Sequence, residues 1–275
     1  MNLRTRWLGA LALACISLAN VCPARAAPLL ASCNNSTING TVVSSAINRT
    51  RNWAYLAVEF WDGAGKGTYA EIDSSNGFSS GWYSGTITYS ISSNCVVNEE
   101  YNDGYGLYPY LFYVNPDGTG LEMVGGQNGD GTWVTSGDAI SKRSLVSATN
   151  ANPACSKKTL KGTYSTSANE ALTGSVKNIM MRWSFDGAGK LTYRNDVFVA
   201  GTKTHSSGFG TYAVNANCQV SIFYGLGSNP VYAAVLAPAG TAFWWLNIEN
   251  TGTTSVGKAK RVSMLPVDNS DVLGL

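Results

Sequence analysis

An internal duplication is the feature that most constrains how this chain folds. The interval from Cys33 to Cys95 is one residue shorter than the interval from Cys155 to Cys218, and both halves contain the same short motifs in the same order. The matched segments are Gly40-Thr41 with Gly162-Thr163, residues 61–66 with 185–190, residues 88–95 with 211–218, residues 117–119 with 239–241, and residues 137–143 with 257–261. Ordered matches at near-constant spacing indicate two copies of one structural unit.

The duplication also predicts where the parts of the chain begin and end. We expect a first repeat at residues 27–144, a linker rich in Ser, Ala and Asn at residues 145–154, and a second repeat at residues 155–264. Residues 265–275 have no counterpart after the first repeat, and we expect them to form a C-terminal tail that is either a strap or disordered.

Residues 1–26 have the pattern of a secretory signal peptide. Arg4 and Arg6 provide a positive start, an apolar stretch follows, and Ala24-Arg25-Ala26 has the small-x-small pattern of a cleavage site. Lipid attachment at Cys15 is the alternative, but the leucine that normally lies three residues before such a cysteine is missing. We therefore expect a mature chain that begins at Ala27 and is secreted or periplasmic.

Cleavage would leave four cysteines, which is typical of an exported chain with two disulfides. Four cysteines allow three pairings, and the duplication selects one of them. Because each pair is equivalent within its own repeat, we expect the bonds Cys33–Cys95 and Cys155–Cys218.

The spacing of strand-like segments predicts an all-β fold. The second repeat contains eight such segments without a convincing amphipathic helix, and they begin near Lys161, Val176, Lys190, Ser207, Cys218, Pro230, Thr241 and Ser255. Asp-Gly pairs at 62–63, 117–118, 130–131 and 186–187 are typical of tight hairpin turns. Short strands at this spacing favour a sandwich or barrel, and eight strands can close and so remove exposed edges. We therefore predict two tandem eight-stranded antiparallel barrels.

Alternation along residues 53–61 separates two faces of a strand. One face carries Tyr55, Ala57, Glu59 and Trp61, and its counterpart in the second repeat carries Ile179, Met181, Trp183 and Phe185. The face that is bulky in both copies is expected to point inward. The opposite, apolar face of Leu56, Val58 and Phe60 then needs a cover, and we expect the two repeats to pack on each other there.

Together these motifs resemble small secreted bacterial proteins of unassigned function. Their barrels are similar to those of the calycins (lipocalin and avidin type) and to allene-oxide-cyclase-like barrels. The resemblance covers both repeats, although the first has Val42 where the second has Tyr164 in the Gly-Thr-Tyr motif. It implies a fold and no catalytic residues, because its motifs are those of turns and disulfides.

Composition excludes several classes of function. Only 13% of the residues are charged and the formal net charge is +2, which argues against a nucleic-acid partner. The chain has one histidine, so neither a histidine-rich metal centre nor a cofactor is expected, and no Ser-His-Asp site with a nucleophile elbow is present. Beyond the N-terminus no apolar stretch is long enough to span a membrane.

Two polar segments are weighed as further candidates. His205 lies in a Thr-His-Ser-Ser-Gly stretch that we interpret as an exposed hairpin loop. Residues 98–104 gather three carboxylates, the ligands that calcium prefers, but without the spacing of a known calcium loop. We interpret this segment as a solvated acidic hairpin and predict no metal site.

Glu59 and the aromatic residues of the first repeat are the main candidates for ligand binding. Glu59 stands where the second repeat has Trp183, so it is either an interior carboxyl that anchors a polar group or a solvated residue at the rim. Most of the 14 tyrosines lie in the first repeat. The alternative is that these rings form ordinary core and interface, with one of Trp244 and Trp245 facing outward or toward the other repeat. We expect a ligand site near one open end of the first barrel, and a better-packed second barrel. The predicted ligand-binding residues are Trp53, Tyr55, Glu59, Trp61, Tyr108 and Tyr110.

Three functions are compatible with this sequence. The favoured one is an exported, non-catalytic protein that binds a small apolar or aromatic ligand inside a barrel. The second is a surface module that binds a glycan or a protein through aromatic patches. The third is a cyclase-type enzyme in which the shape of the cavity promotes the reaction.

Overall fold

The structure, a computed structural model, describes residues 32–48, 52–116, 121–126, 138–139, 155–172, 175–237, 239–249 and 254–266. Its regular elements are β-strands and one short 3-10 helix, so the all-β prediction is confirmed. The expected signal peptide (residues 1–26), linker (145–154) and tail beyond Pro266 lie outside the described residues. Within the described ranges, no helix has both the length and the hydropathy needed to traverse a bilayer.

The elements follow one another in the same way in the two repeats. The first repeat contains the 3-10 helix η1 (Asn35–Thr37) and the strands β1 (Gly40–Asn48), β2 (Trp53–Trp61), β3 (Lys66–Ser75), β4 (Phe78–Ile91), β5 (Val96–Asn102), β6 (Leu107–Val114), β7 (Leu121–Gly126) and β8 (Asp138–Ala139). The second contains β9 (Lys161–Leu172), β10 (Ser175–Asp186), β11 (Lys190–Val199), β12 (Thr202–Val214), β13 (Gln219–Tyr224), β14 (Tyr232–Leu236), β15 (Ala242–Asn247) and β16 (Val256–Ser263).

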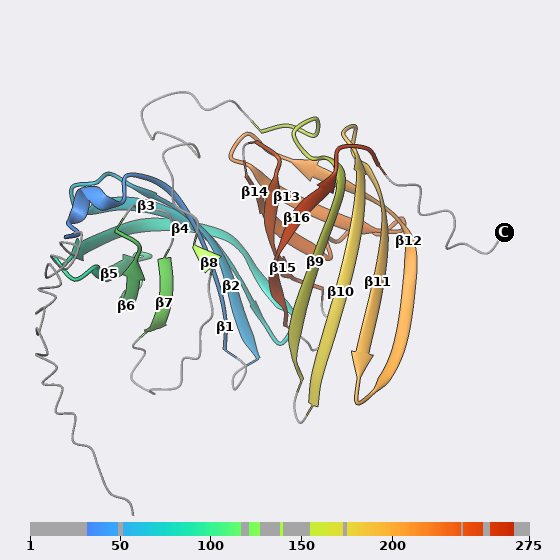
Figure 1. Cartoon of the computed structure of the whole chain (residues 1–275), viewed down its shortest axis with the longest axis horizontal. Coiled ribbons are helices and arrows are strands. Elements are labelled where there is room, and N and C mark those ends of the chain that lie inside the picture. Colours follow the sequence, from blue (N-terminus) through green and yellow to red (C-terminus); the bar gives the residue numbers. More distant parts are fainter. Residues whose placement is uncertain are drawn as a thin grey trace, which may run out of the picture. The chain divides into compact units, whose positions relative to one another are not determined.

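Among the described strands, those of the second repeat alone close into a barrel (Figure 1). There β16 returns to pair with β9 and completes a ring of eight antiparallel strands. In the first repeat β1 to β8 pair in sequence order but remain an open, curled sheet. The prediction of closed barrels is therefore confirmed for the second repeat, whereas the described strands of the first repeat form a curled, open sheet. The physical reason lies in the last strands, since β8 is two residues long and pairs, among the described strands, with β7 alone.

Asp62 and Asp186 shape the hairpin turns predicted from the Asp-Gly pairs at 62–63 and 186–187. Asp62 Oδ1 accepts hydrogen bonds from the backbone N–H groups of Ala64 (2.7 Å) and Lys66 (2.9 Å), and Asp186 Oδ1 does the same between β10 and β11. The following Gly63 and Gly187 have φ values of +76° and +81°, which a residue with a side chain rarely adopts. The pairs at 117–118 and 130–131 lie outside the described residues.

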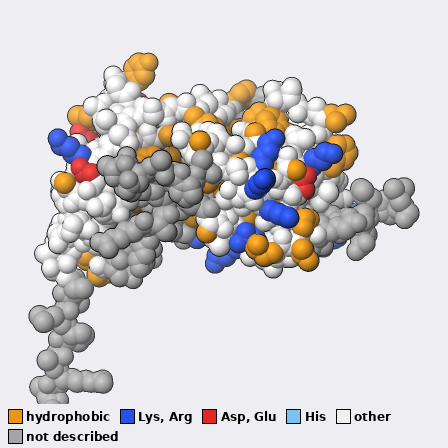
Figure 2. Space-filling model, turned by 90° about the horizontal axis from the view of Figure 1, so that it is seen from above, with side chains coloured by type: hydrophobic (Ala, Val, Ile, Leu, Met, Phe, Trp, Pro, Cys, Tyr) orange, Lys and Arg blue, Asp and Glu red, His pale blue; other side chains and the backbone are white. Residues whose placement is uncertain are grey.

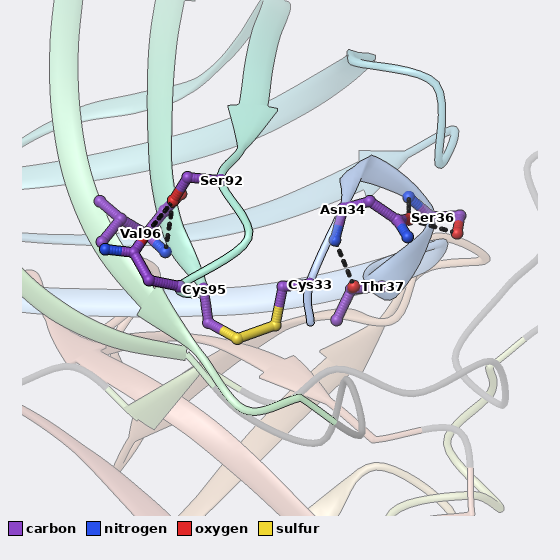
Figure 3. Close-up of a disulfide and its surroundings, with 8 residues drawn as sticks. Cys33, Asn34, Ser36, Thr37, Ser92, Cys95 and Val96 are labelled. Carbon is purple, nitrogen blue, oxygen red and sulfur yellow. Dashed lines mark hydrogen bonds between the residues drawn. A yellow bond between two sulfur atoms is a disulfide. The ribbon is translucent and has the colours of Figure 1, made fainter. Parts of the chain in front are cut away.

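The two disulfides link the predicted partners. Cys33 bonds to Cys95 and Cys155 bonds to Cys218, with Cα–Cα distances of 5.0 Å and 4.9 Å. Figure 3 shows how the first bond ties Cys33, two residues before η1, to the turn that precedes β5. The second cysteine of each pair has positive φ, 66° at Cys95 and 62° at Cys218, so the duplication extends to backbone conformation.

The position of His205 differs from the prediction. It lies within β12, which begins at Thr202, because the turn from β11 falls earlier, at Ala200 and Gly201. His205 stands directly opposite Asp196 on β11 and is exposed. The prediction of a hairpin loop is therefore wrong, whereas the prediction of an exposed side chain is correct.

Three apolar clusters hold the described residues together. One fills the closed barrel and contains Trp183, Phe185 and Trp245, and a second lines the inside of the curled sheet. The third draws Leu56 and Val58 from the first repeat and Val235, Trp244 and Leu246 from the second. This cluster covers the apolar face of β2 that carries Leu56, Val58 and Phe60, as predicted. The adjacent tryptophans of β15 point to opposite sides, as expected for neighbouring strand positions.

Candidate functional site

The inward face of β2 is the one that alternation predicted. Tyr55, Ala57 and Trp61 belong to the cluster inside the curled sheet, and Glu59 lies on the same face with 1% of its surface exposed. The interpretation of Glu59 as a solvated rim residue is therefore wrong. A carboxyl group is held inside the first repeat.

Three hydrogen-bond donors converge on Glu59. Ser44 Oγ and Tyr101 OH both donate to Oε1 at 2.5 Å, and Trp61 Nε1 donates to Oε2 at 2.8 Å. Burial raises the pKa of Glu59, while these three hydrogen bonds act in the opposite direction because they stabilise the ionised form. The donors come from three strands, so the carboxyl links β1, β2 and β5.

A second pair of carboxyls lies on β3. Glu71 and Asp73 share the inner face of this strand, and the hydroxyl of Tyr83 reaches Glu71 Oε1 at 2.7 Å and Asp73 Oδ2 at 2.9 Å. Burial, followed by the charge of Asp73, raises the pKa of Glu71 well above its ordinary value, and burial also raises the pKa of Asp73. Glu71 is buried and Asp73 is half-buried, so the pair extends from the interior toward solvent.

Glu99 is the buried carboxyl with the fewest hydrogen bonds to offset the cost of its burial. It lies on β5 with 2% of its surface exposed, and neither of its oxygens accepts a hydrogen bond from any described residue. Burial raises its pKa well above the ordinary value, and the nearby charges of Glu59 and Glu71 raise it further. In the view of Figure 2, more Lys and Arg than Asp and Glu side chains are visible.

The segment predicted to be a solvated acidic hairpin is thus mostly a strand. Residues 98–102 belong to β5, and of the three carboxylates only Asp103 lies in the turn, where its Oδ1 accepts the backbone N–H groups of Tyr105 and Gly106. The interpretation fails at Glu99, which points inward. Within the described ranges, no group of three His, Cys, Asp or Glu residues is arranged to hold a metal ion.

Tyrosine rings surround the buried carboxyls. The ring of Tyr101 lies 4.7 Å from that of Tyr69 and 4.9 Å from that of Tyr110, both edge-to-face. Tyr110 also stands directly opposite Glu99 in the β5–β6 ladder. Together with Tyr55, these rings line one face of the sheet.

The predicted aromatic residues do not all gather at one end. Trp53 and Trp61 are the first and last residues of β2, so they lie about 26 Å apart at the rise of an extended strand. Trp53 is half-buried and packs on Tyr55 at 5.4 Å, whereas Trp61 is buried against Tyr89 at 4.3 Å. The side chain of Tyr108 lies outside the described part of the chain. Tyr110, Tyr83 and Asp73 are half-buried like Trp53, whereas Trp61 is buried.

Sequence reasoning missed Glu71 and Glu99. The signal that identified Glu59 was available for both, since Tyr69, Glu71 and Asp73 alternate with apolar Ala70 and Ile72. In the same way, Glu99 shares a face with Val97 and Tyr101, and these residues alternate with Asn98 and Glu100. The same alternation in β3 and β5 places these carboxyls on the inner face.

The second repeat offers a different kind of concavity. A groove of about 660 Å³ is lined by residues that include Asp186, Phe209, Leu226 and Pro266. None of its lining residues has a buried polar atom that lacks a hydrogen-bond partner. The stronger chemical signal therefore lies inside the first repeat.

Comparison with known proteins adds little to this geometry. No family model matches the chain, and no curated protein is significantly similar to it. Among solved structures, a protein of unknown function from the DUF3598 family of Nostoc punctiforme PCC 73102 aligns over 82% of this chain and 97% of its own, with 10% identity and a TM-score of 0.27. A score this low carries no argument. The resemblance to calycin-like and allene-oxide-cyclase-like barrels stays a prediction.

Proposed function

We propose that this protein is an exported, non-catalytic binding protein that holds a small molecule with an aromatic or apolar body inside the first repeat. The observation that carries the proposal is Glu99, a buried carboxyl whose two oxygens have no hydrogen-bond partner among the described residues. Buried polar atoms in folded proteins almost always have a partner from protein, water or ligand. A bound molecule surrounded by tyrosine rings would supply one.

The difference in side-chain volume between the repeats supports this assignment. Ala57 and Glu59 occupy the positions that Met181 and Trp183 fill in the second repeat. Both members of the second pair are buried in the barrel core. The first repeat thus places less side-chain volume on its inner face at these positions, which is the condition for accommodating a ligand.

Two features support export. The bonds Cys33–Cys95 and Cys155–Cys218 are of the kind that forms and persists outside the cytoplasm. Residues 1–26 also have the sequence pattern of a signal peptide. The closed second barrel would then act as a packed support for the first repeat.

A titration of the full mature chain with 1-naphthalenemethanol, a neutral aromatic probe, tests the proposal. We expect saturable quenching of tryptophan fluorescence at one probe per chain, and at least about tenfold weaker binding in Ala57→Met, which adds the side chain that the second repeat has at this position. Met181→Leu is the matched control in the second repeat and should bind like wild type. Circular dichroism establishes that each variant is folded.

Two results would contradict the proposal. One is binding that Ala57→Met leaves unchanged, which would place the probe elsewhere. The other is the absence of saturable binding both for this probe and for its charged analogue, 1-naphthylmethylamine.

A surface-interaction role is the second candidate, and one observation favours it. Leu107, Leu111 and Tyr113 lie on the outer face of β6 with 62%, 37% and 48% of their surfaces exposed. Specific retention on a glycan array that Leu111→Lys abolishes would support this role. The cyclase alternative has no comparable support among the described residues, because the carboxyl of Glu59 is already engaged by three donors.

A further inference from the structure

We infer that the small molecule bound by the first repeat carries a positively charged amino or ammonium group, and that Glu99 is its counter-ion. This inference rests on the proposed binding function and specifies the chemistry of the ligand. It comes from the buried carboxyls around Glu99 and from the aromatic rings that flank it.

Glu99 stands between aromatic residues on both neighbouring strands. Its direct partners are Tyr89 on β4 and Tyr110 on β6, and Tyr101 follows on the same face of β5. Directly opposite residues in an antiparallel sheet have Cβ atoms about 5 Å apart, so these rings are within reach of a group bound at the carboxylate. Aromatic faces beside a carboxylate form the kind of cage that binds ammonium groups.

The charge around Glu99 selects a cation over a neutral hydrogen-bond donor. A hydroxyl or amide donor would satisfy Glu99 alone. A cation would also interact favourably with Glu59 and Glu71, which lie close enough to act electrostatically on Glu99, and with Asp73 beyond Glu71. None of the groups that act on Glu59 or Glu99 is a lysine or an arginine. Among the described residues, the groups that act on these two glutamates are therefore acidic or neutral, and an anionic ligand would be repelled.

An organic cation fits these residues better than a metal ion. Within the part of the chain that is described, no three carboxylates converge closely enough to hold a metal. Metal ions require several oxygens at short, fixed distances. An ammonium group needs one ion pair, and aromatic faces can complete its surroundings in a looser geometry.

The second repeat shows that the acidic character is not part of the fold itself. By the alignment of Cys95 with Cys218, the position of Glu99 corresponds to Ile222, which is fully buried in the barrel core. The alignment of Lys66 with Lys190 likewise places Asn195 at the position of Glu71. The duplicated frame folds with apolar or neutral residues at these positions, so the carboxyls of the first repeat are available for binding.

The test compares three probes of one shape and different charge on the full mature chain. These are 1-naphthylmethylamine, which is cationic at neutral pH, 1-naphthalenemethanol, which is neutral, and 1-naphthoate, which is anionic. We expect the cation to bind at least about tenfold more tightly than the neutral probe, since a buried charged hydrogen bond contributes that much, and the anion to bind most weakly. Glu99→Gln should remove most of the preference for the cation and change the affinity for the neutral probe less than about threefold.

Glu100→Gln is the matched control. Glu100 neighbours Glu99 on β5 but belongs to the opposite face of the strand, so this variant should bind all three probes like wild type. Circular dichroism and thermal unfolding verify that both variants are folded.

The possible results separate the two proposals. If none of the probes binds saturably, the proposed function fails. If the neutral probe binds and the cation has no advantage, the binding function stands and the inference of a cationic ligand is overturned. If Glu99→Gln retains the cation preference, the assignment of Glu99 as counter-ion is wrong.

Discussion

Tyr101 in the first repeat and Tyr224 in the second occupy equivalent positions, but they meet different partners. The hydroxyl of Tyr101 donates to the carboxylate of Glu59, whereas the hydroxyl of Tyr224 accepts a hydrogen bond from Trp183 Nε1 at 2.9 Å. Glu59 and Trp183 are themselves equivalent, so the same contact between strands survives with the direction of donation reversed. The duplicated frame therefore tolerates either an indole or a carboxyl at its centre.

The surrounding frame differs much less than the interior. Asp62 and Asp186 shape the same turn, and the second cysteine of each pair adopts the same positive φ. The two repeats differ in the closure of the sheet and in the side chains inside it. The second repeat is a closed barrel around a large aromatic core, whereas the described strands of the first form an open sheet whose interior also contains Glu59, Glu71 and Glu99. The comparison teaches that turns and disulfides specify the strand order, while the interior residues are free to specialise.

The largest effect on the free energy of unfolding is expected when a side chain is removed from the core of the second repeat. We expect Trp183→Ala to lower the free energy of unfolding by about 3–5 kcal/mol, because it removes a fully buried indole and leaves a cavity. At the equivalent position of the first repeat, Glu59→Gln keeps the shape of the side chain, leaves no cavity and should cost about 1 kcal/mol. Urea unfolding of the two variants measures both values. Equal losses would mean that the two interiors are held in the same way.

The disulfides should contribute equally, in contrast to the interiors. Replacing both cysteines of either bond by serine should lower the free energy of unfolding by about 2–4 kcal/mol, since the closed loops of 62 and 63 residues are nearly the same size. The measurement is thermal unfolding of the two double variants. A loss confined to one repeat would show that the two bonds are not equivalent.

The pH dependence of stability should come from the first repeat. Burial raises the pKa of Glu59, Glu71 and Glu99 in the folded state above the unfolded value. In the ligand-free protein, the stability that comes from protonation of these carboxyls is therefore complete below the unfolded pKa and is lost as the pH rises through the folded pKa. Each carboxyl that is protonated only in the folded state adds a slope of about 1.4 kcal/mol per pH unit.

Urea unfolding at pH 5 and pH 8 checks this sign. Wild type should be more stable at pH 5, and Glu99→Gln should reduce the difference. The lowered pKa values of Asp62, Asp186 and Asp196 act in the opposite direction, but only at more acidic pH. Greater stability at pH 8 than at pH 5 would contradict the burial of uncompensated carboxyls.

The smallest expected effect concerns the turns. Asp62→Ala and Asp186→Ala each remove a side-chain acceptor that binds backbone N–H groups in its turn, and each should cost about 1 kcal/mol. The two losses should agree within experimental error in thermal unfolding. A clear difference would mean that closure of the second barrel changes how much its turns contribute.

The local features of this fold could be predicted from its sequence, and its long-range features could not. The disulfide pairing, the turn at Gly63 and the inner face of β2 follow from spacing and alternation, which act over a few residues or are repeated by the duplication. Closure of a barrel depends on pairing between the first and last strands, and the two-residue β8 has no distinct sequence signal. The early start of β12 has the same origin, since its register is set by the partner strand β11.

The candidate site was predicted in part. Glu59 stood out because the duplication provided Trp183 for comparison, while Glu99 was hidden among neighbouring acids that resemble a solvated loop. Its burial depends on the pairing of β5 with both β4 and β6, which lies beyond what a short segment can indicate.

The alternating tryptophans of β15 have a consequence for how this chain can change over time. Every residue of β15 is buried, with Trp245 inside its own barrel and Trp244 against the first repeat, where Lys258 Nζ lies 5.0 Å from its ring centre. A descendant that lost the first copy would expose the Trp244 side of this strand to water, and one that lost the second copy would expose Leu56 and Val58 of β2, so either loss would invite aggregation. The duplication is thus difficult to reverse. Selection can alter the interior of one copy, but only while β15 is conserved.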